Sequence, residues 1–240
     1  MPRFFAAYFK CVTISTTADA IVITSRGLPP HPSYYWGEGD PNFAAFDTSR
    51  GSDYLPNPNK LREKSLRVSI PSAPVAKGLT ITSAMVDGVV GTSAEEYSLG
   101  PVGIALDSVA IFNPLAAPGD DIEKERFTFD DYSAHPSPDG AYHYHTTSKG
   151  PLEVLASIGA TSGVELYGVM CDGTFVLGCT ELDASSPDLT ALDAQGGHVH
   201  DLKDASGTVH FTARYHVHVC PSKGGRKYTP EIQWYSTCGK

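Results

Sequence analysis

The sequence of 240 residues has no long apolar run, little positive charge and none of the common catalytic signatures. No segment approaches the roughly 18 consecutive apolar residues of a membrane-spanning helix. The 18 Lys and Arg residues are outnumbered by 27 Asp and Glu residues, which gives a net charge of −9. We therefore expect no membrane span and no nucleic acid as a partner, because nucleic-acid-binding proteins need a basic surface. Serine-hydrolase, Walker and dinucleotide-binding glycine motifs are also missing, which disfavours those classes of enzyme.

Cysteine is sparse, and its spacing excludes a Cys-x-x-Cys zinc or redox motif. Four of the five cysteines lie in the last 70 residues, and pairing sequence neighbours predicts the disulfides Cys171–Cys179 and Cys220–Cys238, with Cys11 free or partnered elsewhere. Four cysteines allow three connectivities, and buried free thiols are the alternative. Disulfides favour an exported protein, secreted or periplasmic, whose leader has been removed.

Segments rich in Val, Ile and Thr alternate with turn residues, a pattern typical of short strands. The 23 glycines and 18 prolines disfavour a helical bundle, and a single short helix is expected around residues 152–158, ending at Gly159. We predict one domain over residues 1–240, mainly β, with a sandwich-like fold of short antiparallel strands and long loops. The expected strands lie within residues 11–25, 68–70, 79–85, 102–112, 164–170, 174–177 and 208–220.

An approximate internal duplication relates residues 103–145 to residues 168–218. Each copy begins with an apolar segment interrupted by an Asp-Ser or Asp-Gly pair, at Asp107 and Asp172, which predicts a hairpin turn. Each copy ends in a strand with alternating histidines. Pseudo-symmetry would bring these two strands to equivalent places.

Histidines occur in three His-x-His pairs, whereas random placement of nine histidines gives about 0.3 such pairs. Residues i and i+2 of a strand point to the same face, so two imidazoles can converge on one ion at about 2.0–2.1 Å. The pattern predicts a metal site in which both alternating pairs belong to one cluster, completed by histidines from upstream loops; His31 and His210 are interpreted as structural. The candidate ligands are His143, His145, His216, His218, His135, His198 and His200.

The tyrosines of the same strands fall on the opposite face. Tyr142 and Tyr144 flank His143, and Tyr215 takes the first position of the second copy. Their rings are expected to pack into the core, away from the ion. Should the protein be an enzyme, these three tyrosines are the candidate proton donors and acceptors.

The histidine segments resemble those of the YHYH-domain proteins, which are mostly exported and often bacterial. The resemblance rests on residues 103–121, 135–145, 172–173, 196–201 and 215–218 and the closing Cys238-Gly239. The chain departs from the family pattern at Val217, where Tyr is usual, and at Ser108, where Gly is usual. The resemblance implies metal binding, export and a YHYH-like domain, and it supplies no reaction.

Two metals and three kinds of function are compatible with these residues. Imidazole ligands suit copper and zinc, and copper(II) is favoured because it binds nitrogen more tightly and no carboxylate ligand is evident. The first hypothesis is an exported metal-binding protein, with the further possibility of an oxidoreductase, lyase or hydrolase acting on a small molecule or an extracellular polymer such as a polysaccharide. A metal-free His/Tyr acid–base lyase or hydrolase is the second, and a non-catalytic metal-binding module is the third.

Overall fold

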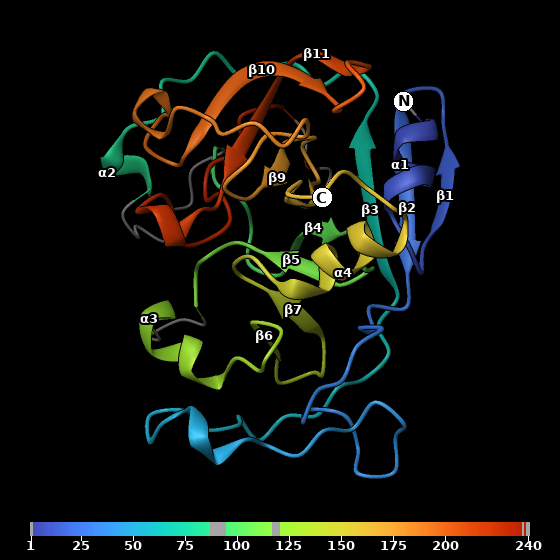
Figure 1. Cartoon of the computed structure of the whole chain (residues 1–240), viewed down its shortest axis with the longest axis vertical. Helices are drawn as coiled ribbons and strands as arrows, with labels where there is room; N and C mark the ends of the chain where they lie inside the picture. Colours follow the sequence, from blue (N-terminus) through green and yellow to red (C-terminus); the bar gives the residue numbers. More distant parts are fainter. Residues whose placement is uncertain (1, 87–94, 117–120, 237, 239–240) are drawn as a thin grey trace.

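The structure, a computed structural model, describes residues 2–86, 95–116, 121–236 and 238 (Figure 1). In this part of the chain, eleven strands form a three-stranded sheet in the order β1-β2-β3 and an eight-stranded sheet in the order β10-β11-β9-β8-β4-β5-β7-β6. The smaller sheet consists of β1 (Thr13–Thr16), β2 (Ala20–Ser25) and β3 (Leu66–Pro71). The larger sheet consists of β4 (Pro101–Ala105), β5 (Ala110–Phe112), β6 (Ala134–Pro136), β7 (Tyr142–Tyr144), β8 (Leu166–Met170), β9 (Phe175–Leu177), β10 (Gly197–Lys203) and β11 (Val209–His218). The predicted mainly β fold is confirmed.

Helices are short and lie outside the sheets. The predicted helix corresponds to α4 (Lys149–Ser157), whose N-cap Ser148 accepts a hydrogen bond from the amide of Gly150. A second helix, α1 (Pro2–Tyr8), was not predicted from the sequence; it buries Phe4 and Phe5 against the aromatic core. The other two α-helices of the described chain are α2 (Ser83–Val86) and α3 (Ile122–Glu125). None of the helices described has the length and apolar character needed to cross a bilayer.

The larger sheet repeats one four-strand unit about a pseudo-twofold axis. Read outward from the centre, β4-β5-β7-β6 on one side matches β8-β9-β11-β10 on the other. The axis passes between β4 and β8, where Ile104 pairs with Val169. Most pairings are antiparallel, whereas β5–β7 and β9–β11 are parallel. Figure 1 shows the consequence, with β10 and β11 at one end of the molecule and β6 and β7 toward the other.

Both predicted hairpins are present, at β4–β5 and β8–β9. Their turns need a positive φ after the aspartate, at Ser108 (φ 75°) and Gly173 (φ 98°). Glycine adopts this conformation freely, whereas serine tolerates it at some cost. The departure from the family pattern at Ser108 therefore occurs at a position where glycine is favoured on backbone grounds.

Two apolar clusters cover the two faces of the larger sheet, because successive strand residues point in opposite directions. Val169 belongs to the cluster that includes the three-stranded sheet and α1. The next residue, Met170, belongs to the other cluster, which contains many of the buried tyrosines. The central strands β4, β8 and β9 are therefore buried on both sides, and they present apolar residues at successive positions.

The disulfides are Cys171–Cys238 and Cys179–Cys220, so the predicted pairing of sequence neighbours is wrong. The chain does not close small local loops here. The C-terminal segment returns to the turn of the β8–β9 hairpin, and the segment after β9 lies beside the end of β11. Cys11 is free and exposed.

Candidate metal sites

The structure brings seven side chains together in two separate groups. We call the first site A, formed by His135, His143 and His145, and the second site B, formed by Glu181, His198, His216 and His218. Within each group the possible ligand atoms all lie within 4.8 Å of one another. Each site draws its histidines from one hairpin of the larger sheet: β6 and β7 and the residue after them for site A, and β10 and β11 for site B.

The expectation of one cluster containing both alternating pairs is wrong. Four strands separate β7 from β11 in the larger sheet, which corresponds to about 24 Å at the usual spacing between strands. The internal duplication does bring the two strands to equivalent places, but these places lie on opposite sides of the axis between β4 and β8. Duplication therefore yields two sites and no shared one.

In site A the strand geometry presents three nitrogens to one point. His135 and His143 are cross-strand partners, and their Nε2 atoms lie 3.1 Å apart. His145, two residues along the chain, places its Nε2 2.9 Å from that of His143. All three residues are 2–3% exposed. Ligands bound at 2.0–2.1 Å in a tetrahedron are about 3.3 Å apart, so the spacing is close to that of a coordination shell.

The other ring nitrogen of each histidine in site A fixes its tautomer. Nδ1 of His143 lies 2.9 Å from the carbonyl oxygen of Ala141, and Nδ1 of His145 lies 2.6 Å from that of Asn113. A carbonyl oxygen only accepts, so both Nδ1 atoms carry the hydrogen. Nδ1 of His135 also makes a hydrogen bond, but its partner is a side-chain hydroxyl that in turn donates to a backbone carbonyl.

This hydroxyl belongs to Thr128. It donates to the carbonyl of Glu125 and therefore accepts from Nδ1 of His135, at 2.6 Å. Bonds of this kind from a ligand's second nitrogen are typical of histidines that bind metal, because they orient the ring and fix which nitrogen is free.

Three unprotonated nitrogens consequently face one another in site A. Burial, helped by the nearby His145, lowers the pKa of His135 to about 3, and burial lowers the pKa of His145 to about 4. Burial also holds the pKa of His143 well below its usual value. All three rings are neutral at pH 7, with the hydrogen on Nδ1 and a lone pair on Nε2. Lone pairs only about 3 Å apart repel each other, and a bound cation removes that repulsion.

Site B repeats this arrangement and adds a carboxylate. Nδ1 of His216 donates to the carbonyl of Arg214, and Nδ1 of His218 donates to that of Gly178. His198 is the cross-strand partner of His216, with their Nε2 atoms 2.8 Å apart. The site therefore has three imidazoles in the positions that site A uses.

The carboxylate of Glu181 contacts all three imidazoles of site B. Its oxygens lie 3.1 Å from Nε2 of His198, 3.1 Å from that of His216 and 3.3 Å from that of His218. Burial alone would raise the pKa of Glu181, but its hydrogen bonds to the three imidazoles outweigh burial and hold the pKa far below its usual value. The carboxylate is ionised at neutral pH and available as a ligand.

Glu181 was not predicted from the sequence because it lies in a loop, where no periodicity indicates the direction of a side chain. The loop is anchored by the disulfide Cys179–Cys220. Glu181 is two residues beyond Cys179, and His218 is two residues before Cys220. Had the Cys179–Cys220 pairing been known, the equal two-residue separations would have indicated that Glu181 lies near His218.

The remaining histidines lie outside both groups. His200 is exposed on β10, with its ring 5.8 Å from that of His198, and the structure does not bring this predicted ligand into site B. His31 is buried, stacked on Tyr132 and hydrogen-bonded to the hydroxyl of Tyr144. His210 pairs with Asp204 at the surface hairpin.

The three candidate catalytic tyrosines are buried, and their hydroxyls bind carboxylates. Tyr142 donates to Asp130, Tyr144 to Asp107 and Tyr215 to Asp193. All three belong to the tyrosine-rich cluster on one face of the sheet, as strand alternation predicts. A catalytic role for them stays a prediction.

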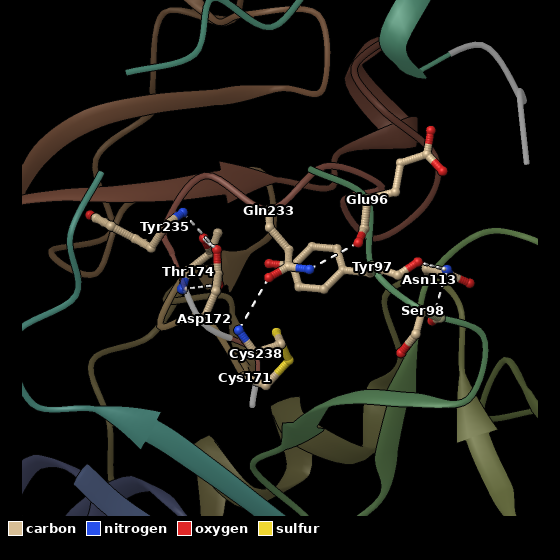
Figure 2. The surroundings of a disulfide bond; sticks show 10 residues. All are labelled: Glu96, Tyr97, Ser98, Asn113, Cys171, Asp172, Thr174, Gln233, Tyr235 and Cys238. Atoms are coloured by element: carbon tan, nitrogen blue, oxygen red, sulfur yellow. Dashed lines mark hydrogen bonds between the residues drawn. A yellow bond between two sulfur atoms is a disulfide. The ribbon is translucent and has the colours of Figure 1, made fainter. Parts of the chain in front are cut away.

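The C-terminal segment is connected to site A by a series of hydrogen bonds that ends at Asn113. The carbonyl of Asn113 accepts from Nδ1 of His145. Figure 2 shows the side-chain amide of Asn113 donating to the carbonyls of Tyr97 and Ser98. Gln233 donates to the carbonyl of Glu96, the residue before Tyr97, and accepts from the amide of Cys238. The disulfide therefore holds the segment that orients a site A ligand.

Site A opens into a pocket of about 660 Å³. The three histidines line it together with Glu125, whose carboxylate lies 3.6 Å from Nε2 of His135. Unlike Glu181, Glu125 does not lie within 4.8 Å of all three nitrogens. Among the residues described, no carboxylate joins the three histidines of site A as a fourth member of the group.

Comparison with known proteins gives one result. The family model described as YHYH protein matches residues 81–204, which is more than half of the chain. The match includes site A and His198 but ends before His216 and His218. No curated protein and no solved structure matches the chain.

Proposed function

Because the chain belongs to the YHYH protein family, whose name spells residues 142–145 of this sequence, we propose that it is an exported metal-binding protein holding one ion in each site. The observation that carries the proposal is the set of three neutral imidazoles in site A whose unprotonated nitrogens face one another at 2.9–3.1 Å. A folded protein does not gain from this contact unless a cation lies between the nitrogens.

Zinc is the ion we propose for site B. Glu181 is adjacent to all three imidazoles, at 3.1–3.3 Å. A square-planar copper(II) site would place one ligand trans to the carboxylate at about 4 Å, whereas a tetrahedron makes every ligand pair adjacent. Four protein ligands, three of them buried, are typical of a structural zinc ion. We propose that this ion fixes the β10–β11 hairpin against the loop after β9.

Site A suits a different role, with zinc or copper as its ion. Three histidines and a position open toward a pocket of about 660 Å³ are the features of a catalytic metal centre. We propose that site A acts on a small molecule or on part of an extracellular polymer such as a polysaccharide. Export is supported by the two disulfides, which persist in oxidising compartments.

A metal-free acid–base enzyme is a second candidate, supported by one arrangement. Tyr144 donates to Asp107, and Nε2 of His31 lies 3.0 Å from the Tyr144 hydroxyl. His31 lines a pocket of about 320 Å³ together with Glu153. Activity that survives complete removal of metal would favour this candidate over site A.

Elemental analysis of protein purified without a histidine tag tests the proposal. After reconstitution with zinc or copper and removal of excess ion, we expect two equivalents per chain. His143→Ala and His216→Ala should each retain one equivalent, and His210→Ala, a histidine outside both sites, should retain two. Wild-type protein that binds no metal at micromolar concentration, or a His143→Ala variant that retains two equivalents, would refute the proposal.

A further inference from the structure

We propose that site A is a hydrolytic centre in which Glu125 removes the proton from a metal-bound water that attacks an uncharged carboxylic ester in the adjoining pocket. This inference rests on the proposed function, because the water is bound by the ion of site A. It adds the reaction, the base and the class of substrate. Four observations support it: an incomplete ligand set, the place of Glu125, its link to a ligand and the composition of the pocket.

The first observation is the contrast between two carboxylates in equivalent surroundings. In site B, Glu181 reaches all three imidazoles at 3.1–3.3 Å and completes a four-ligand set. In site A, a carboxylate oxygen of Glu125 lies 3.6 Å from Nε2 of His135, and Glu125 is not a member of the group. An ion held by the three histidines of site A therefore keeps a fourth position for water, with a carboxylate beside it.

The second observation is where Glu125 lies between the interior and the pocket. The side chain of His135 is 2% exposed, whereas that of Glu125 is 23% exposed. Both line the same pocket, together with His143 and His145. A carboxylate at this border can accept a proton from a water bound to the ion and can release it toward the pocket, as a general base needs to do.

The third observation is a hydrogen-bonded link between the base and a ligand. The hydroxyl of Thr128 donates to the backbone carbonyl of Glu125 and accepts from Nδ1 of His135. One threonine thus fixes the backbone that carries the base relative to the ring that binds the ion. The N-terminus of this turn is capped by Asp121, whose side chain accepts from the amide of Glu123. The distance from base to water is therefore set by local structure.

The fourth observation is the composition of the pocket, which suits an ester with apolar parts. Among the residues described, its charged lining residues are Asp121, Lys124 and Glu125, whose formal charges sum to −1 and would be offset by a divalent ion in site A. Apolar side chains, including Leu99 and Leu115, give room for an acyl or alcohol group.

The reaction is a balanced hydrolysis without a redox step. Glu125 accepts a proton from the bound water, and the resulting hydroxide attacks the carbonyl carbon of the ester. A new carbon–oxygen bond forms, the bond to the leaving alkoxide breaks, and the alkoxide receives the proton from Glu125. The products are a carboxylic acid and an alcohol, and the base returns to its ionised form.

The test uses full-length protein reconstituted with zinc, with p-nitrophenyl acetate as the ester and bis(p-nitrophenyl) phosphate as the diester. The variants are Glu125→Gln and, as a matched control on the same helix, Glu123→Gln, whose carboxylate pairs with Arg126 and Lys227 outside this pocket. Metal content is measured for each protein by elemental analysis before kinetics, so that loss of metal and loss of the base are distinguished.

We expect wild type and Glu123→Gln to bind two equivalents of zinc and to hydrolyse the ester in preference to the diester. Glu125→Gln should keep both ions but lose about 100-fold in kcat, and the acidic limb of its pH profile should disappear. Three outcomes would overturn the inference while metal binding stands: no ester hydrolysis by the two-zinc protein, a Glu125→Gln rate within threefold of wild type, or loss of one zinc ion from Glu125→Gln, which would make Glu125 a ligand. Preference for the diester would refute the substrate class. Wild type without bound zinc would overturn the proposed function as well.

Discussion

Removing the metal should make this protein sensitive to mild acid. In the metal-free state the buried histidines are neutral, and burial lowers the pKa of His31 and His145 to about 4 and that of His135 to about 3. In the unfolded chain each has a pKa near 6.5. Below pH 6.5 the unfolded state therefore binds protons that the folded state excludes. The free energy of unfolding should fall as the pH decreases from 6.5 to about 4.

The loss in the free energy of unfolding at pH 5 depends on how far pH 5 lies below the pKa of histidine in the unfolded chain. Each of the three histidines loses about 2 kcal/mol of stability at pH 5, or about 6 kcal/mol together. His143 changes stability in the same direction. Asp107 opposes them, because burial raises its pKa to about 6 and protonation of the folded state returns about 1 kcal/mol at pH 5. A loss of about 5 kcal/mol is comparable with the whole stability of many domains.

Urea denaturation at pH 7.5 and pH 5, followed by tryptophan fluorescence with the disulfides intact, measures this loss. Trp36 and Trp234 report on different parts of the fold, since Trp36 donates to the carbonyl of His31 and Trp234 stacks on Tyr215. His135→Gln should reduce the difference between the two pH values by about 2 kcal/mol, whereas His200→Gln, at an exposed position, should leave it unchanged. A metal-free wild type whose stability at pH 5 is within 1 kcal/mol of its value at pH 7.5 would refute the reasoning.

Three further predictions concern single side chains. Glu181→Gln removes the charged ligand of site B, so elemental analysis should find one zinc ion in place of two, and two ions would contradict its role. His145→Ala should weaken binding to site A at least 100-fold in a calorimetric titration, whereas His31→Ala should not, because His31 lies outside both groups. Gly150→Ala should destabilise the fold by about 2 kcal/mol in urea, since a Cβ there would overlap the carboxylate of Asp107; an unchanged stability would show that the helix can shift.

Most strands and both hairpins could be predicted because their signal is local, but residues 79–85, predicted as a strand, overlap the helix α2, and β6 and β10 lie where loops were predicted. Alternation around His143 fixed which side chains share a face, and the Asp-Gly pair at Asp172 marked a turn. Chain connectivity at longer range could not be predicted in this way. Cys171 bonds to Cys238, 67 residues away, because the C-terminal segment crosses back over the sheet.

The histidines of the two sites could be predicted from the sequence, but the presence of two sites and the carboxylates near them could not. Cross-strand pairing explains why His135 lies beside His143 and why His198 lies beside His216. Sequence similarity between two units implies a symmetry axis but does not locate it. Because the axis lies between β4 and β8, the two histidine hairpins are far apart and form two separate groups. Glu125 and Glu181 come from non-repetitive segments, whose side-chain directions depend on tertiary contacts.

The disulfide Cys179–Cys220 has a consequence for the order of assembly. It joins the same two segments that an ion in site B would join, since Glu181 lies two residues after one cysteine and His218 lies two residues before the other. If metal reached the reduced chain first, two thiols beside the histidines would compete with Glu181 for it, because thiolate is a strong ligand for zinc and copper(I). Oxidation of the two thiols to the disulfide removes these competing ligands and also fixes the segments that carry Glu181 and His218. If site B holds an ion as proposed, we expect metal loading to follow disulfide formation, because the timing of oxidation would determine which atoms are free to bind the ion.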